Sequence, residues 1–336
     1  MQINRVNQKD KDFPEQIKEK VQKMKNRLEK NEDEFPTLIK EMEDFTTKCP
    51  DSASVAVLHS MIAEMYNHYY YANRWKINER TSLSDFIPDD IREWSQNLFK
   101  NKIKEELEAS LRNAQLLQQT PADKFSAIMT KGKDSPTLRP TLFDFLSYRA
   151  IEIQPQESYY LNLLAFRNTK PGEKATMMSN LDYLQYKNED NLDEANTQYR
   201  ASLDSLLEFY KDKDFCIEII ADIVDNLKYK NDSIAEQYNL CKEWIARYPN
   251  YERINLLKNR LADIEKSTIS VETNKNVYPG KTLDIQLNYK NTQRITVLIY
   301  NSLLKPEDEF DYPRNRNVTY GKLVKKTEFN LIIPNT

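Results

Sequence analysis

Glycine is scarce in this sequence, which contains only four: Gly132, Gly172, Gly280 and Gly321. Their positions are too far apart for the glycine spacing of dinucleotide-binding or phosphate-binding loops, so both kinds of nucleotide site are excluded. The scarcity of glycine also favours a helical protein over an all-β chain.

Histidine and cysteine are almost as rare, with two and three residues. His59 and His68 are nine residues apart on an expected helix, so they point in nearly opposite directions and cannot share a metal ion. Cys49, Cys216 and Cys241 form no CxxC pair. A Cys216–Cys241 bridge stays open, and the alternative is that each cysteine is a small core residue.

These shortages leave little material for catalysis. Serine occurs without a GxSxG motif, and two histidines on opposite sides of a helix cannot complete a Ser-His-Asp or zinc site. The cysteines also lack the Cys-x-Glu-Gln pattern of an internal thioester. We therefore expect no catalytic, cofactor-binding, metal-binding or thioester residues, and no enzyme activity.

The charge pattern excludes further classes. The 49 basic and 52 acidic residues are spread along the chain and give a formal charge of −3, so we expect no nucleic-acid partner. No run of about 18 apolar residues exists, so no membrane span is expected. The opening MQINRVNQKDKDF lacks the apolar core of a signal peptide, which taken literally predicts a cytoplasmic protein. Removal of an export signal would leave the same start.

Helical periodicity dominates the first four-fifths of the sequence. Apolar residues recur at helical spacing over residues 17–28, 35–45, 51–73, 99–117 and 141–153, with Asp51 as the N-cap of the third helix. Residues 131–140 are expected to form a loop. Residues 155–171 contain apolar side chains without a clear period, so we expect irregular structure there.

From about residue 192 the helices become regular. Apolar stripes cover residues 192–206, 216–227, 234–245 and 254–264, and successive helices start about 17 to 20 residues apart, a spacing typical of antiparallel pairs in a solenoid. The segment AEQYNLCKEWIARYPNY, residues 235–251, resembles the second helix of a tetratricopeptide repeat. No full repeat consensus recurs.

After Lys266 the period changes to two, which indicates strands. Leu283, Ile285, Leu287 and Tyr289 fall on one face of a strand; residues 295, 297 and 299 fall on one face of the next. Residues 278–280, Tyr-Pro-Gly, predict a turn, and KKTEFNLIIP predicts a last strand. About four strands fall short of the roughly seven of an immunoglobulin-type sandwich, so we expect an incomplete β domain and a chain that stops partway through a longer protein.

The stretch MYNHYYYANRW, residues 65–75, is the densest aromatic cluster in the sequence. On a helical wheel Leu58, Ile62, Met65 and Tyr69 share one face, which describes a helix with neighbours on most sides. We interpret the tyrosines mainly as core residues whose hydroxyls find partners at the rim. The alternative is an aromatic docking surface.

Several of these segments carry a resemblance to a known family. LHSMIAEMYNHYYYANRWKINERT, SLRNAQLLQQTPADKFSAIM and RPTLFDFLSYRAIEI occur in an order that resembles the N-terminal helical region of large bacterial alpha-2-macroglobulin-family proteins. ISVETNKNVYPGKTLDIQLNYKN is similar to the opening strands of a macroglobulin domain. The similarity spans most of the chain from residue 58 to residue 336.

The resemblance implies a cell-envelope, periplasmic or extracellular protein whose parent traps proteases by collapsing around them after cleavage of a bait segment. The fold class is then mainly α: an antiparallel, TPR-like or solenoid-like helical array over residues 1–266, most repeat-like over 192–266, followed by a partial macroglobulin-like β-sandwich over 267–336. The bait segment would lie beyond residue 336, so this chain would hold none of the family's reactive parts.

Other motifs have ordinary interpretations. The acidic run PEDEFD, residues 306–311, offers oxygen ligands for Ca²⁺ but lacks the EF-hand register, so a solvated loop is favoured. NEDNLDE, residues 188–194, is expected to be an acidic helix entry. Asn231 and Asn317 begin glycosylation sequons, a three-residue pattern that often arises by chance.

Three functional hypotheses follow. The first is a non-catalytic scaffold and interaction region of an alpha-2-macroglobulin-like protein, with partners in the rest of the parent chain and in proteases. The second is a free-standing helical-repeat adaptor that binds a protein or peptide, with Trp75, Trp94 and Trp244 as candidate contact residues. The third is an enzyme whose deep polar pocket the sequence does not reveal.

Overall fold

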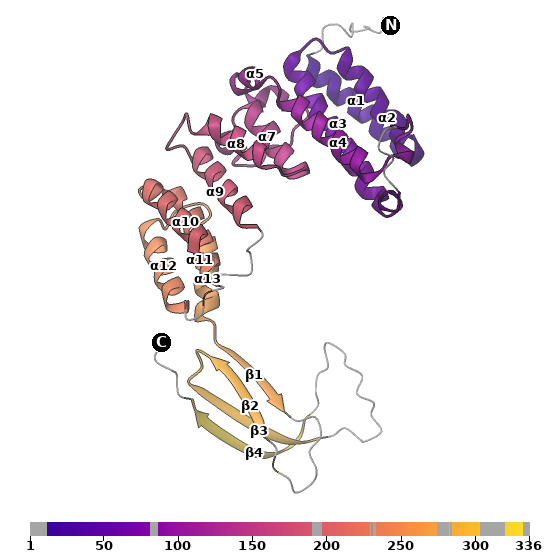
Figure 1. Cartoon of the computed structure of the whole chain (residues 1–336). Coiled ribbons are helices and arrows are strands. Elements are labelled where there is room, and N and C mark those ends of the chain that lie inside the picture. The colour runs from indigo at the N-terminus through magenta and orange to yellow at the C-terminus, as the bar shows by residue number, and fades with distance from the viewer. Residues whose placement is uncertain are drawn as a thin grey trace, which may run out of the picture. The chain divides into compact units, whose positions relative to one another are not determined.

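The computed structural model of the protein describes residues 12–80, 87–189, 197–228, 230, 233–273, 282, 284–302 and 320–331. The chain divides into two compact units, one formed by Met1–Leu192 with Thr197–Asp212 and the other by Asp193–Asn196 with Lys213–Thr336. The predicted domain boundary at residue 266 falls inside the second unit. The protein is mainly helical, with a small antiparallel β region in the second unit (Figure 1).

The first unit is entirely helical in its described residues. Its α-helices are α1 (Phe13–Leu28), α2 (Phe35–Thr47), α3 (Ser52–Asn78), α4 (Gln96–Leu111), α5 (Ala114–Gln119), α6 (Ser135–Leu138), α7 (Leu142–Ile153), α8 (Glu157–Arg167), α9 (Lys174–Asn188) and α10 (Thr197–Tyr210). Three short 3₁₀ turns lie between them: η2 (Glu32–Glu34), η3 (Ile91–Glu93) and η4 (Ala122–Phe125).

The longest helix, α3, organises the core of this unit because it packs against α2, α4 and α7 (Figure 1). Leu58 and Ile62 of α3 meet Phe99 and Leu107 of α4, and all four side chains are buried. The predicted N-cap is confirmed: Asp51 accepts a hydrogen bond from the backbone N–H of Ser54 at 3.0 Å. The helix ends at Asn78, one turn beyond the predicted end.

A buried ion pair joins α7 to α8. Thr141 and Asp144 form a capping box at the start of α7, in which the Thr141 hydroxyl donates to the Asp144 carboxylate at 2.6 Å. The same carboxylate accepts from the guanidinium of Arg167, and both side chains are fully buried. The pair fixes the start of α7 against the end of α8.

The prediction of irregular structure over residues 155–171 is wrong, because α8 occupies most of that segment. Tyr159 and Leu163 are buried one turn apart, as an amphipathic helix requires. The next residue on that face is Arg167, whose charge interrupts the apolar pattern although its side chain is 0% exposed. The buried positions therefore follow helical spacing, but the apolar residues alone do not, because one buried position is an arginine.

Two further boundaries differ from the sequence-based expectation. The single helix predicted over residues 99–117 is two helices, because Asn113 takes a non-helical conformation (φ −96°, ψ 60°) at the N-cap of α5. The loop predicted over residues 131–140 contains the one-turn helix α6. The predicted helix over 141–153 is confirmed as α7.

The second unit begins with a 3₁₀ turn, η6 (Asp214–Cys216), and three helices, α11 (Ile217–Leu227), α12 (Ile234–Arg247) and α13 (Asn255–Glu265). Consecutive members of this trio pack against one another, as the regular spacing predicts. Cys216 and Cys241 form no disulfide and are both fully buried, so the interpretation as small core residues is confirmed and the bridge is not formed.

The β region holds two separate two-stranded antiparallel sheets. β1 (Thr268–Thr273) pairs with β2 (Ile285–Lys290), and β3 (Arg294–Ser302) pairs with β4 (Tyr320–Asn330). Four strands are described, as predicted, although β4 begins earlier than expected. The Asn291 side chain donates to the Ile264 carbonyl at 2.7 Å, which fastens the turn after β2 to the end of α13.

Several sequence-based predictions lie wholly or partly outside the described residues. They concern the turn at 278–280, Leu283, the acidic run 306–311, most of the run 188–194 and the sequon asparagines Asn231 and Asn317.

Candidate functional site

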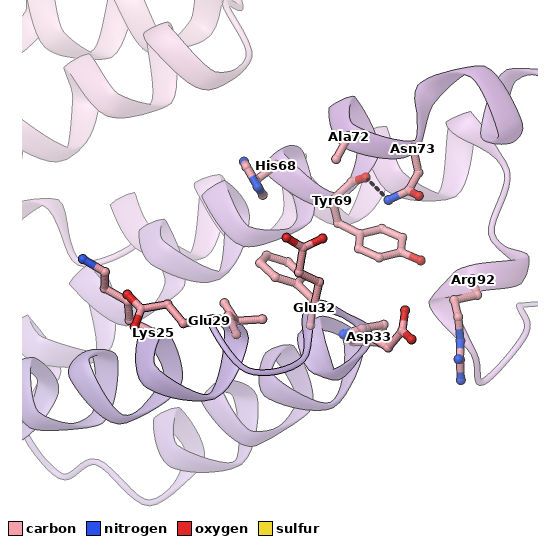
Figure 2. A pocket seen from close by; sticks show the side chains of 12 residues that line it. Lys25, Glu29, Glu32, Asp33, His68, Tyr69, Ala72, Asn73 and Arg92 are labelled. Carbon is pink, nitrogen blue, oxygen red and sulfur yellow. Dashed lines mark hydrogen bonds between the residues drawn. The ribbon is translucent and has the colours of Figure 1, made fainter.

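A groove of about 600 Å³ lies between the end of α1, the turn η2 and the C-terminal half of α3 (Figure 2). Its volume falls within the range of about 300–1,000 Å³ that ligand pockets occupy. A smaller hollow of about 230 Å³ shares Pro36 and Arg92 with it and continues toward Lys40 and Asp89. The two hollows therefore adjoin each other on the first unit.

The groove has an aromatic floor. Phe35 lies between His68 and Tyr69, with ring centroids 5.6 Å and 6.0 Å away, and Tyr69 stacks on the core residue Phe99 at 5.8 Å. Burial raises the pKa of Tyr69, so its hydroxyl remains a neutral hydrogen-bonding group at physiological pH. The floor is therefore continuous with the core, which holds its rings in place.

Acidic side chains form one wall. Glu29 follows α1, and Glu32 and Asp33 lie in η2; Figure 2 shows Glu32 and Asp33 near the aromatic rings and Glu29 beside Lys25. Within the part of the chain that the structure describes, none of these three carboxylates has a salt bridge or accepts a side-chain hydrogen bond. The neighbouring Glu34 differs, because its carboxylate is paired with Arg27. The wall thus carries three carboxylates that no described side chain pairs directly.

The two cations that line the main groove, Lys25 and Arg92, offset this charge only in part. Arg92 reaches the edge of the groove, but its Nε donates to both carboxylate oxygens of Asp90, at 3.1 Å and 3.0 Å. This hydrogen bonding raises the pKa of Arg92 and lowers the pKa of Asp90. Across both hollows, five carboxylates lie with three Lys or Arg side chains, a net charge of −2.

The aromatic cluster at residues 65–75 serves the core and the groove at once. Tyr66 and Tyr70 are buried, and the Tyr66 hydroxyl donates to Glu43 at 2.9 Å, as the core interpretation predicts. Tyr69 lines the groove, whereas Tyr71 is 57% exposed. The core interpretation is therefore confirmed for Tyr66 and Tyr70, and the docking interpretation stays a prediction.

The two histidines do not meet. His59 places Nδ1 2.6 Å from the Glu106 carboxylate on α4, and His68 lies in the groove against Phe35. In the described segments, no group of three His, Cys, Asp or Glu side chains is placed to hold a metal ion. No helix in those segments is long and apolar enough to cross a membrane.

The three candidate contact tryptophans have different environments. Trp75 is 76% exposed on α3, with the Arg74 guanidinium 5.3 Å from its ring. Trp94 is buried, stacks on Tyr66 at 5.5 Å and donates from Nε1 to the Pro88 carbonyl at 2.7 Å. Trp244 is buried in α12 of the second unit. Only Trp75 is positioned to contact a partner without rearrangement.

Sequence reasoning did not identify the acidic wall. Glu29, Glu32 and Asp33 belong to the polar run between two amphipathic helices, where acids ordinarily face solvent. The available signal was the position of this run beside Phe35 and Pro36, at the start of a helix whose aromatic residue faces α3. That α3 supplies the opposite wall depends on tertiary packing.

Comparison with known proteins does not identify a family for this chain. No protein-family model, curated protein or solved structure matches the chain significantly.

Proposed function

We propose that this chain is a non-catalytic protein-binding scaffold, in which a helical array supports a β region that docks onto other polypeptide. In its finer form the proposal is the one that the sequence resemblance implies: a TPR-like array and a partial macroglobulin-like sandwich from the entry region of an alpha-2-macroglobulin-like protein. The observation that carries the proposal is an exposed apolar face on the β1–β2 sheet.

The two faces of this sheet differ sharply in chemistry. On one face, Ile269 lies opposite Tyr289 and Val271 opposite Leu287. The other face carries only polar pairs: Thr268 with Lys290, Ser270 with Asn288 and Glu272 with Gln286. Side chains alternate along a strand, so this pattern predicts one covered face and one hydrated face.

The apolar face is nevertheless largely exposed. Ile269, Val271 and Ile285 are 50%, 56% and 43% exposed. Burying a fully exposed side chain of this kind contributes about 1.5–3 kcal/mol, so covering the exposed half of each contributes about 1 kcal/mol, and several together favour association with another surface. Further strands of a sandwich would supply this cover, and so would a protein partner.

The protease-trapping activity of a parent protein is a further step of the proposal. It rests on the sequence resemblance alone, because this chain lacks the Cys-x-Glu-Gln thioester pattern. The proposed role of the chain is therefore to position and to contact, without turnover. The same resemblance implies a location in the cell envelope or outside the cell.

One observation favours the alternative of a free-standing helical adaptor. The groove on the first unit and the exposed Trp75 offer a contact surface that does not involve the strands. In that case the principal partner would bind the helices, and the β region would be secondary.

Site-specific photo-crosslinking tests the proposal. A photo-reactive amino acid replaces Val271 on the apolar face, and the matched control places it at Glu272, the next residue, which points to the opposite face. In the native cells, we expect a specific polypeptide crosslink from position 271, at least about fivefold stronger than from position 272. Equal crosslinking from both positions would contradict docking through this face. Strong crosslinking from position 75 together with none from 271 would favour the adaptor.

A further inference from the structure

The groove on the first unit combines features that together select one ligand chemistry. Its floor is formed by the rings of Phe35 and Tyr69, which stack on each other, and its wall carries the carboxylates of Glu29, Glu32 and Asp33. Aromatic faces and carboxylates both attract cations, aromatic rings through their quadrupole and carboxylates through their charge. An anionic ligand would meet the net negative charge of the wall, so it is disfavoured.

The shape of the depression favours polypeptide over a small cation. The main groove and the hollow at Lys40 and Asp89 share Pro36 and Arg92, so the two surfaces adjoin and offer more room than a small cation fills. On α3, Trp75 lies about 20° around the helix from His68, which continues the aromatic surface beyond the groove. A chain that places one side chain in the groove therefore has further surface to contact.

We propose that this groove binds a basic segment of a protein partner, with an arginine or lysine side chain lying over Phe35 and Tyr69 and paired with the carboxylates of Glu32 and Asp33. This inference rests on the proposed function, since it names a partner class for a protein-binding scaffold. Arginine suits the site better than lysine because its planar guanidinium stacks on aromatic rings and pairs with two carboxylate oxygens at once. The Asn73 side chain does not compete with the cation for the carboxylates, because its amide nitrogen already donates to the Tyr69 carbonyl at 3.0 Å.

The experiment uses the full chain and a short fluorescein-labelled peptide of alternating arginine and alanine, followed by fluorescence anisotropy. A control peptide carries glutamine at each arginine position. We expect the arginine peptide to bind at least about tenfold more tightly than the glutamine peptide. We also expect its affinity to fall as NaCl is raised from about 0.05 to 0.5 M, since salt screens exposed charges.

The decisive comparison is between two variants with the same change in net charge. Glu32→Gln with Asp33→Asn neutralises the groove wall, whereas Asp44→Asn with Glu152→Gln neutralises two exposed acids outside the groove. We expect the first pair of substitutions to weaken arginine-peptide binding about tenfold and the second to change it less than twofold. Circular dichroism melting checks that both variants remain folded.

Equal binding by the two variants, or equal binding of the two peptides, would overturn the inference. Spermidine, a small polycation, tests whether the site selects polypeptide. We expect spermidine to displace the labelled peptide only at concentrations at least about tenfold higher than unlabelled peptide requires. Displacement at equal concentrations would overturn the assignment to polypeptide. If both variants bind the arginine peptide as tightly as the unmodified protein and the crosslink from position 271 persists, this inference is wrong and the proposed function still stands.

Discussion

At the scale of single residues, two buried tyrosines on different helices differ in whether their hydroxyls have a hydrogen-bond partner. Tyr66 donates to Glu43 at 2.9 Å. Tyr159 is buried on α8, and among the described residues its hydroxyl has no hydrogen-bond partner. Burial raises the pKa of Tyr159 to about 12, so the group is a neutral phenol throughout the physiological range. A buried hydroxyl without a partner costs free energy.

This difference predicts opposite effects of the same substitution. Tyr159→Phe removes an unsatisfied polar atom and is expected to raise the free energy of unfolding by about 1 kcal/mol. Tyr66→Phe removes a satisfied hydrogen bond and is expected to lower it by about 1 kcal/mol. Urea unfolding followed by circular dichroism measures both, and a destabilised Tyr159→Phe would contradict the assignment.

A second residue-scale feature is the buried carboxylate of Glu106. Burial alone would raise its pKa, but hydrogen bonds from His59 at 2.6 Å and a salt bridge with Lys102 at 2.8 Å outweigh burial, and the pKa is lowered from the ordinary value of 4.5. A carboxyl whose pKa is lower in the folded state stabilises the fold above its unfolded pKa. That contribution is lost as the pH falls through the folded pKa.

We therefore expect Glu106→Gln to cost about 2 kcal/mol of unfolding free energy at pH 7, the scale of hydrogen bonds to a charged group. The difference between this variant and the unmodified protein should narrow as the pH is lowered below about 4.5. Urea midpoints at pH 7 and pH 3.5 measure it. The control Glu108→Gln removes only an exposed pair with Lys104 and should change the free energy by less than about 0.5 kcal/mol. A cost for Glu106→Gln that is independent of pH would contradict the account.

At the scale of elements, the β3–β4 ladder depends on a glycine. The register shifts between Ile299 and Ser302 of β3, and Gly321 of β4 lies against this irregularity. A Cβ at position 321 would sit 2.6 Å from the carbonyl oxygen of Asn301, closer than real atoms approach. The absence of a side chain therefore lets the two backbones come together.

Gly321→Ala is accordingly expected to weaken the ladder by about 1–3 kcal/mol, because a backbone atom must move. Hydrogen–deuterium exchange of peptides covering residues 320–331 should become faster by at least about fivefold. Gly132→Ala is the matched control, since its Cβ would meet only the Ser135 hydroxyl at 3.4 Å, and exchange around it should not change. Unchanged exchange in β4 would contradict the dependence of the ladder on this glycine.

The prediction of helices from sequence succeeded where apolar periodicity and a capping residue agree. It failed where a charged residue occupies a buried position. The start of α3 follows from Asp51, and α7 follows from its apolar face after Thr141. Helix α8 escaped prediction because its buried stripe ends in a charged residue, Arg167, which is satisfied by an acid on another helix. A single-sequence pattern contains no information about that partner.

The candidate groove was predictable only in part, for a related reason. The aromatic cluster on α3 is visible in the sequence, and docking was one of its two interpretations. Glu32 and Asp33 become wall residues only because Phe35 packs against His68 and Tyr69, more than 30 positions along the chain. Contacts of this kind arise from tertiary packing, so local periodicity does not reveal them.

At the scale of the whole molecule, the two kinds of architecture are unequal in how well they bury apolar groups. The helical parts contain nearly all the buried side chains, whereas Ile295 is the one buried hydrophobic residue in the strands that the structure describes. Strands such as β4 place Leu323 and Phe329 largely in solvent. The helices are therefore the stable framework, and the strands are the part that gains most from association.

The three free thiols give this framework an internal reporter. Cys216 and Cys241 are completely shielded inside the second unit, while Cys49 of the first unit is only half-buried. A maleimide dye added to the native protein therefore modifies Cys49 first and reaches the shielded pair only during transient opening of α11 and α12. Mass spectrometry of the labelled chain thus reads the opening equilibrium of those helices directly, with no engineered probe.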